Sequence, residues 1–168
     1  MSARTSALLI AAAVGGLDRA TKAWVERSVS MWDTIVVVPG FFQIIHTRNR
    51  GIVFGLFSEA EGILRTLVVL AAAAVALVVL MAWLWRLPEP APGAWSYTGL
   101  ALGLILGGAA GNLWDRLFEG AVIDFLDFHL AGYHWPAFNL ADSAITVGAG
   151  LLLAELFLTR RSAQPGRQ

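Results

Sequence analysis

The sequence contains no cysteine and little charge, and both absences narrow what the protein can be. Without cysteine there are no disulfides, no thiolate metal sites and no thiol catalysis. Charged residues make up 14% of the 168 residues and hydrophobic residues 57%, whereas soluble domains are about 25% charged and about 45–50% apolar. Twelve basic residues balance twelve acidic ones, so the net charge is zero. A zero net charge disfavours a nucleic-acid partner. The composition is typical of an integral membrane protein.

Four apolar stretches predict an all-α membrane protein with four transmembrane helices in a single domain over residues 1–168. The spans are expected at about 6–25, 64–86, 93–115 and 138–159. The clearest, Thr66 to Trp85, has twenty residues without a charge, which in a helix is about 30 Å, the thickness of the hydrocarbon core. An alternative for the first stretch is a cleavable signal peptide, since Arg4 precedes an apolar run. With four spans both termini lie on one side, which basic residues at Arg4, Arg86 and the tail assign to the cytoplasm.

A β-rich segment separates the first two predicted spans, at about residues 31–60. The runs 35–38 and 41–45 are rich in β-branched and aromatic residues. Pro39 and Gly40 lie between them, and this pair suits the centre of a tight turn. The segment predicts a small extracytoplasmic sheet at the membrane surface.

Two carboxylates at a membrane edge are the strongest candidates for chemistry, because acids are costly there. Asp124 follows the third span in an apolar setting, and Asp142 begins the fourth. Because they bracket one loop, both belong at the same membrane face. Two adjacent carboxylates share a proton, so one can act as a base on water while the other protonates the substrate. The alternative is that each is a helix cap, with Asn139 as the N-cap residue three positions before Asp142.

Asp127 lies three residues beyond Asp124 and is expected to be a solvated loop carboxylate. Together with His129 and His134 it could suggest a metal site. The spacing matches no standard zinc pattern, so the sequence predicts no metal and no cofactor.

Other polar and small residues fall in or beside the spans. Gly103, Gly107 and Gly111 recur every four residues, which allows close helix packing. Gly108, Asn112 and Arg116 share one helix face, where the arginine either holds a carbonyl or carboxylate or snorkels to the interface.

A charged pair on the first span and a polar segment before the second span each have a simple structural interpretation. Asp18 and Lys22 are spaced to neutralise one another on the first span. The segment from Asn49 to Gly55 is either a plain turn or a loop that offers hydrogen bonds to an extended peptide.

Taken together, these segments resemble the lipoprotein signal peptidases, the type II signal peptidases of bacteria. The resemblance covers nearly the whole chain and five motifs occur in the family's order. They are Asp18-x-x-x-Lys22, Asn49-x-Gly51-x-x-Phe54-Gly55, Gly107-Gly108-x-x-Gly111-Asn112-x-x-Asp115-Arg116, Val122-x-Asp124-Phe125 and Phe138-Asn139-x-Ala141-Asp142-Ser143.

The resemblance implies an aspartyl endopeptidase of the bacterial cytoplasmic (inner) membrane, with its active site at the extracytoplasmic face. Its substrate would be a prolipoprotein whose cysteine carries a diacylglyceryl group, cut just before that cysteine. If the roles of the family's motif residues are transferred to the matching positions, Asp124 and Asp142 are the catalytic pair. The residues implied to bind substrate or support the site are Asp18, Lys22, Asn49, Gly51, Phe54, Gly108, Asn112, Arg116, Asn139 and Ala141. Membrane lipid is the other expected partner, and a monomer the expected state.

The helix dipole suggests how the two acids divide their roles. Asp142 lies near the positive end of the fourth span, so it should stay ionised while Asp124 keeps the shared proton.

Three other classes compete with the peptidase reading. A proton or ion relay would spread its acids across the membrane depth, whereas these two cluster at one edge. An intramembrane protease of the presenilin type would carry a Gly-x-Gly-Asp signature, which is absent. A structural subunit would leave the polar motifs unexplained.

Overall fold

The computed structural model describes residues 2–50, 63–89 and 96–162. They form four long helices and a four-stranded antiparallel sheet. The helices are α1 (Ala3–Ser28), α2 (Ile63–Arg86), α3 (Tyr97–Phe118) and α4 (Leu140–Ser162). Each includes most of a predicted span, so the helical parts of the prediction are confirmed to within a few residues.

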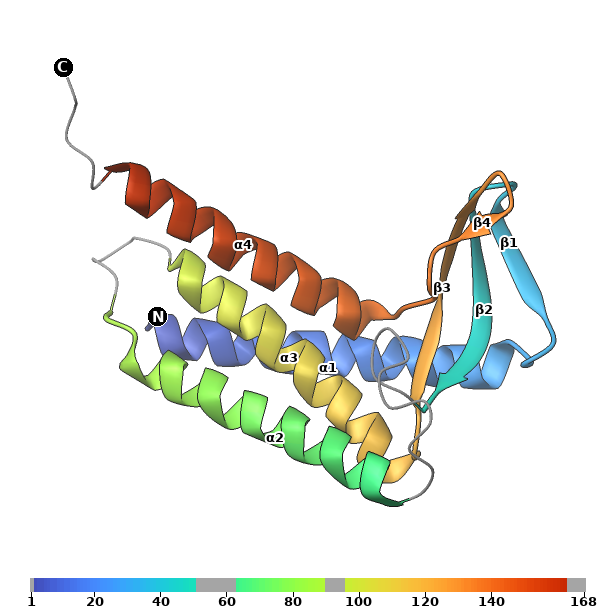
Figure 1. The fold of residues 1–168 in the computed structure, drawn as a ribbon, viewed down its shortest axis with the longest axis horizontal. Helices are drawn as coiled ribbons and strands as arrows, with labels where there is room; N and C mark the ends of the chain where they lie inside the picture. Colours follow the sequence, from blue (N-terminus) through green and yellow to red (C-terminus); the bar gives the residue numbers. More distant parts are fainter. Residues whose placement is uncertain (1, 51–62, 90–95, 163–168) are drawn as a thin grey trace.

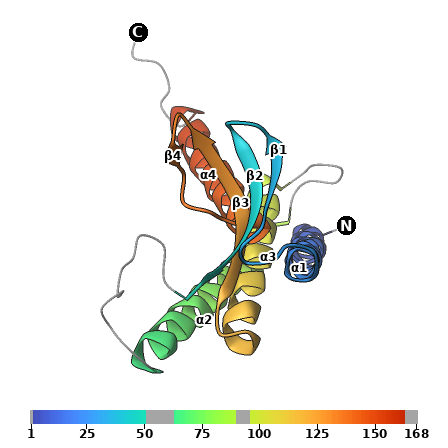
Figure 2. The same cartoon turned by 90° about the vertical axis from the view of Figure 1, so that its right-hand side faces the viewer.

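The helices form a bundle in which α3 packs against the other three. The sheet lies at one end of the bundle, while the beginning of α1 and the end of α4 lie at the other (Figure 1). Figure 2, viewed from the sheet end, shows the strands lying across the helix ends. The sheet and the bundle therefore meet along one boundary.

Glycines allow α3 to approach its neighbours closely. A methyl group added at Gly107 would lie 2.6 Å from the carbonyl oxygen of Ala11 on α1. One added at Gly103 would lie 2.7 Å from the carbonyl of Ala7, and one at Gly111 would lie 2.5 Å from Asp18 Oδ2. The close packing predicted from the four-residue spacing is thus confirmed.

The sheet has the order β1-β2-β3-β4, with strands β1 (Thr34–Val38), β2 (Phe42–Asn49), β3 (Val122–Leu130) and β4 (Tyr133–His134). The predicted turn joins the first two strands: Phe41 N donates to Val38 O at 3.0 Å. Gly40 has φ +73°, as position three of a type II turn requires.

The predicted β-rich segment at residues 31–60 supplies β1 and β2, but the sheet also contains two strands that the sequence did not predict. β3 and β4 follow the third helix, and β3 is the central partner of β2. The run from Val122 to Leu130 is rich in β-branched and aromatic residues and extends a sheet edge that β2 leaves open. The fold is therefore not all-α: it is a helical bundle with a sheet whose strands come from two separate parts of the chain.

Two helices, α2 over Thr66–Arg86 and α4 over Leu140–Leu158, are long and apolar enough to cross a membrane. Most of their side chains are not buried in the protein: the buried share is 11% for α2 and 17% for α4. The glycines and Asn112 lower the hydropathy of α3, and Asp18, Arg19 and Lys22 lower that of α1. Four membrane spans therefore stay a prediction.

Candidate active site

Asp124 lies on β3 at the boundary between sheet and bundle, paired in register with Thr47 of β2. Its carboxylate is only 3% exposed and accepts two amide hydrogen bonds. Asn49 Nδ2 donates to Oδ2 at 2.9 Å, and Asn139 Nδ2 donates to Oδ1 at 2.7 Å. Burial raises the pKa of Asp124 to about 6, and the nearby charge of Asp142 adds to the rise against the two hydrogen bonds that lower it.

Asp142 occupies the first turn of α4, where Asn139 caps the helix. Asp142 N donates to Asn139 Oδ1 at 2.9 Å, and Asn139 N donates back to Asp142 Oδ2 at 3.3 Å. This reciprocal pair is a capping box built from an asparagine and an aspartate. The other carboxylate oxygen accepts from Asn112 Nδ2 at 2.8 Å. The capping role considered from the sequence is therefore present. It holds the Asp142 carboxylate in place, which is compatible with a catalytic role for the same residue.

Asn139 joins the two carboxylates. Its side chain is fully buried, and its amide nitrogen faces Asp124 Oδ1, with Ile123 O and Asn112 Oδ1 each at 3.3 Å. Its amide oxygen accepts the Asp142 backbone N–H. One side chain thus connects the beginning of β3 with the start of α4, and brings Asp124 and Asp142 into one hydrogen-bonded cluster.

A buried ionic layer lies beneath this cluster. Lys22 Nζ is 2.7 Å from Asp18 Oδ2, 2.7 Å from Asp115 Oδ2 and 2.9 Å from Asn112 Oδ1. Arg19 Nη1 completes the layer at 2.6 Å from Asp115 Oδ1. Lys22 and Arg19 thus balance the two fully buried carboxylates, Asp18 and Asp115. Arg19 Nη2 is also 4.0 Å from the partly exposed Glu119. Since Lys22 occupies Asn112 Oδ1, the amide nitrogen of Asn112 is directed to Asp142.

The other predicted residues that the structure describes lie in the same region. Ala141 N donates to Asp18 Oδ1 at 3.0 Å, and a methyl group added at Gly108 would collide with the Ala141 carbonyl. Arg116 Nη1 donates to the Asn112 carbonyl at 3.0 Å, and its charge interacts with those of Asp142, Asp124 and Asp115. Gly51 and Phe54 lie outside the described residues.

Two members of the ionic layer were not predicted as site residues: Arg19 and Asp115. Each is adjacent in sequence to a predicted one, Asp18 and Arg116 respectively. The signal was their position inside predicted spans, where an ionisable side chain is costly unless paired.

The expectation that Asp127 is a solvated loop carboxylate is wrong. It lies on β3 and is 4% exposed, with Gln43 Nε2 donating to Oδ2 at 2.6 Å. Both of its oxygens are 3.0 Å from His134 Nδ1. Burial favours a raised pKa, but the hydrogen bonds from Gln43 and His134 and the charges of both histidines prevail, so the pKa of Asp127 lies below its usual value. Strand pairing buries this carboxylate, which no local sequence signal indicates.

The sequence of the chain matches the pattern of the signal peptidase (SPase) II family over residues 10–158. The chain belongs to this family. Among relatives, the lipoprotein signal peptidase of Solibacter usitatus is 48% identical over 162 residues, covering 95% of both chains. That of Syntrophotalea carbinolica is 43% identical over 148 residues, covering 87% of both.

The fold is also similar to solved structures. A bacterial membrane enzyme determined by the in meso method at 2.3 Å resolution superposes with a TM-score of 0.82. It is 27% identical and the match covers 98% of this chain and 94% of that one. Membership of the signal peptidase II family makes the chain a membrane peptidase, and confirms the resemblance found from the motifs.

Proposed function

We propose that this protein removes signal peptides from diacylglyceryl-modified prolipoproteins, using Asp124 and Asp142 as an aspartyl pair. The names of the relatives support the substrate class. The observation that carries the mechanism is the cluster itself: two carboxylates from different elements share the buried Asn139. Buried, closely placed acids of this kind divide into a proton donor and a base.

In the proposed reaction Asp142 is the base and Asp124 the acid. Asp142 takes a proton from water, whose oxygen attacks the carbonyl carbon before the lipidated cysteine. Asp124 gives its proton to the carbonyl oxygen, which leaves a neutral tetrahedral intermediate. The C–N bond then breaks as Asp142 passes its proton to the cysteine nitrogen and Asp124 takes a proton back from a hydroxyl of the intermediate. Both carboxyl groups return to their starting states, and no covalent bond to the enzyme forms. The raised pKa of Asp124 supports its role as the protonated partner.

The amides around the pair would hold these roles fixed. Asn112 donates to Asp142, and Asn49 and Asn139 donate to Asp124. None of these donors has to reorganise as charge moves between the carboxylates, and such preorganisation is what lowers a barrier in a site shielded from water.

The membrane arrangement completes the proposal. We place α1 and α3 across the membrane beside α2 and α4, with both termini in the cytoplasm and the sheet on the extracytoplasmic face. The pair then lies at the depth where a diacylglyceryl group would hold the scissile bond. Each buried CH₂ of that lipid contributes about 0.8 kcal/mol of anchoring, and anchoring makes the attack of water effectively intramolecular. The protein would act as a monomer in the bacterial inner membrane.

The test is cleavage of a lipidated precursor in detergent, compared with the same precursor without lipid. Asp124→Asn and Asp142→Asn should each lower kcat by about 10²–10⁴-fold, the usual contribution of a general acid or base. Asp127→Asn is the matched control, because Asp127 is also a buried carboxylate on β3. It should cleave at nearly the wild-type rate, with or without a metal chelator. Full activity in either dyad variant would refute the assignment.

A further inference from the structure

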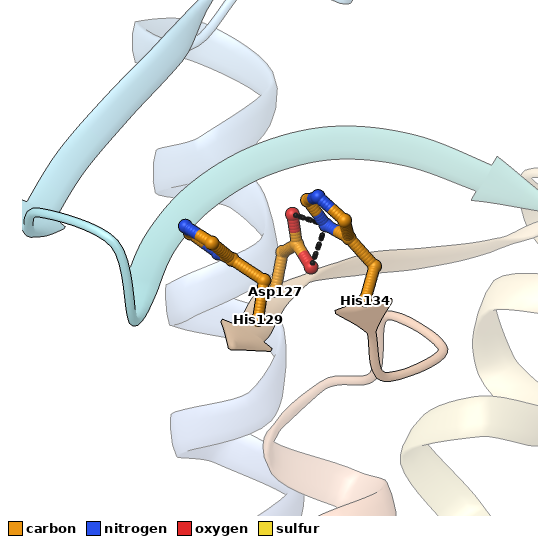
Figure 3. A group of neighbouring side chains, drawn as sticks. All are labelled: Asp127, His129 and His134. Atoms are coloured by element: carbon orange, nitrogen blue, oxygen red, sulfur yellow. Dashed lines mark hydrogen bonds and ion pairs between the residues drawn. The ribbon is translucent and has the colours of Figure 1, made fainter. Parts of the chain in front are cut away.

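The β3–β4 hairpin brings together three side chains that bind metals, and none of them belongs to the proposed catalytic cluster. His129 and His134 are register partners across the two strands. Asp127 precedes His129 by two residues, so it lies on the same face of β3. Figure 3 shows Asp127 and His134 facing each other, with the His129 side chain beside Asp127. A short turn closes the hairpin, with positive φ at Ala131 and Gly132.

The spacing of the donor atoms is close to that of a coordinated ion. The three ligand atoms lie within 4.8 Å of one another. Zinc bonds of about 2.0–2.1 Å place neighbouring ligand atoms on a tetrahedral ion roughly 3.3 Å apart. The 3.0 Å between His134 Nδ1 and Asp127 is already of this size. His129 is farther away, with its ring stacked on that of His134 at a centroid distance of 4.8 Å, so binding requires its side chain to turn toward the ion.

The surroundings are those of a built site rather than a chance surface cluster. Gln43 holds the Asp127 carboxylate from behind at 2.6 Å, as hydrogen bonds to ligating carboxylates do in metal sites. His129 Nδ1 is buried and has no hydrogen-bond partner among the described residues. The His134 side chain is 53% exposed, which gives an ion access from solvent.

From this geometry we propose that Asp127, His129 and His134 bind one divalent transition-metal ion of the zinc class. Two imidazoles and one carboxylate suit Zn²⁺ and its neighbours, whereas Ca²⁺ and Mg²⁺ prefer all-oxygen sites. Water would take the fourth position.

The ion would act on the hairpin and not on peptide cleavage. Asp124 is three residues from Asp127, an odd number, so the two carboxylates project from opposite faces of β3. Cross-linking β3 to β4 through the ion would stiffen the hairpin while leaving the catalytic face unchanged. The proposed metal site and the proposed peptidase activity can therefore be tested separately.

The test is a Zn²⁺ titration of the full chain in detergent, purified with a tag that contains no histidine. The chain has three histidines and no cysteine, so the ligands are few and each can be replaced. Calorimetry should show one Zn²⁺ per chain, and Co²⁺ should give the visible absorption of a tetrahedral site. His129→Ala and His134→Ala should each weaken binding at least tenfold.

His46→Ala is the matched control, because His46 lies on β2 and contacts the Val29 carbonyl instead. It should bind Zn²⁺ like the wild type. Hydrogen exchange supplies a second measurement: Zn²⁺ should slow exchange at residues 127–134 in the wild type and not in His134→Ala. Retained cleavage activity in His134→Ala shows that this variant is folded. No saturable binding, or equal binding by the wild type and a His129→Ala/His134→Ala double variant, would overturn the proposal.

Discussion

The substitution Lys22→Met probes the buried ionic layer directly. Lys22 is fully buried and is within 2.7 Å of two carboxylates, those of Asp18 and Asp115. With Arg19 the layer holds two positive and two negative charges. Methionine has a similar length but no charge, so the variant leaves one buried negative charge uncompensated.

The expected cost is large. Removing one partner of a buried ion pair destabilises proteins by about 3–5 kcal/mol, a substantial part of the about 5–15 kcal/mol that holds a typical domain together. The double variant Lys22→Met/Asp18→Asn restores neutrality. It should therefore be more stable than Lys22→Met alone. Because the two residues are in contact, the double-mutant cycle should give a coupling energy of about 0.5–3 kcal/mol.

The assay is unfolding by sodium dodecyl sulfate in mixed micelles, followed by tryptophan fluorescence. Arg27→Met is the control, because Arg27 is an exposed cation on the same helix; it should change stability by less than about 0.5 kcal/mol. If Lys22→Met is as stable as the control, or if the double variant is no better than the single one, the charge-balance reasoning is refuted.

Three further predictions concern helix packing and pH. Gly107→Ala should destabilise the protein by about 1–3 kcal/mol, because the new methyl would lie 2.6 Å from the Ala11 carbonyl; Gly16→Ala, with no atom within 4 Å, should not, and the same unfolding assay compares them. If Asp124 is the acid, kcat/KM should fall above about pH 6, since its proton is lost as pH rises through its pKa; a flat profile from pH 5 to 8 would contradict this. Asn49→Ala removes a hydrogen bond that lowers the pKa of Asp124, so the falling limb should move to higher pH; a limb that stays in place or moves lower would count against the role of Asn49.

The helices, the first hairpin and the contact between Asp18 and Lys22 could be predicted from the sequence because they follow from local patterns. Long apolar runs indicate helices of membrane length, and Pro39-Gly40 indicates a turn. The Asp18–Lys22 pair follows from helical periodicity, and the structure places the two charges 2.7 Å apart.

The second half of the sheet was missed because its partner is distant in sequence. β3 pairs with β2, about 80 residues earlier, as in Gln43↔Asp127. Burial of Asp127 depends on that pairing and on Gln43, so a local pattern could only suggest an exposed loop. The joining role of Asn139 was likewise hidden, because its capping position was visible but its contact with Asp124 was not.

The two aspartates are carried by different parts of the molecule, one by a strand outside the bundle and one by a helix within it. A chain whose helices have inserted but whose strands have not yet docked therefore holds half of a pair. Under the proposed function such a chain would be inactive, because it would hold the acid and the base in separate places. Docking of β3 against the start of α4 would then complete the fold and begin proteolysis in a single event.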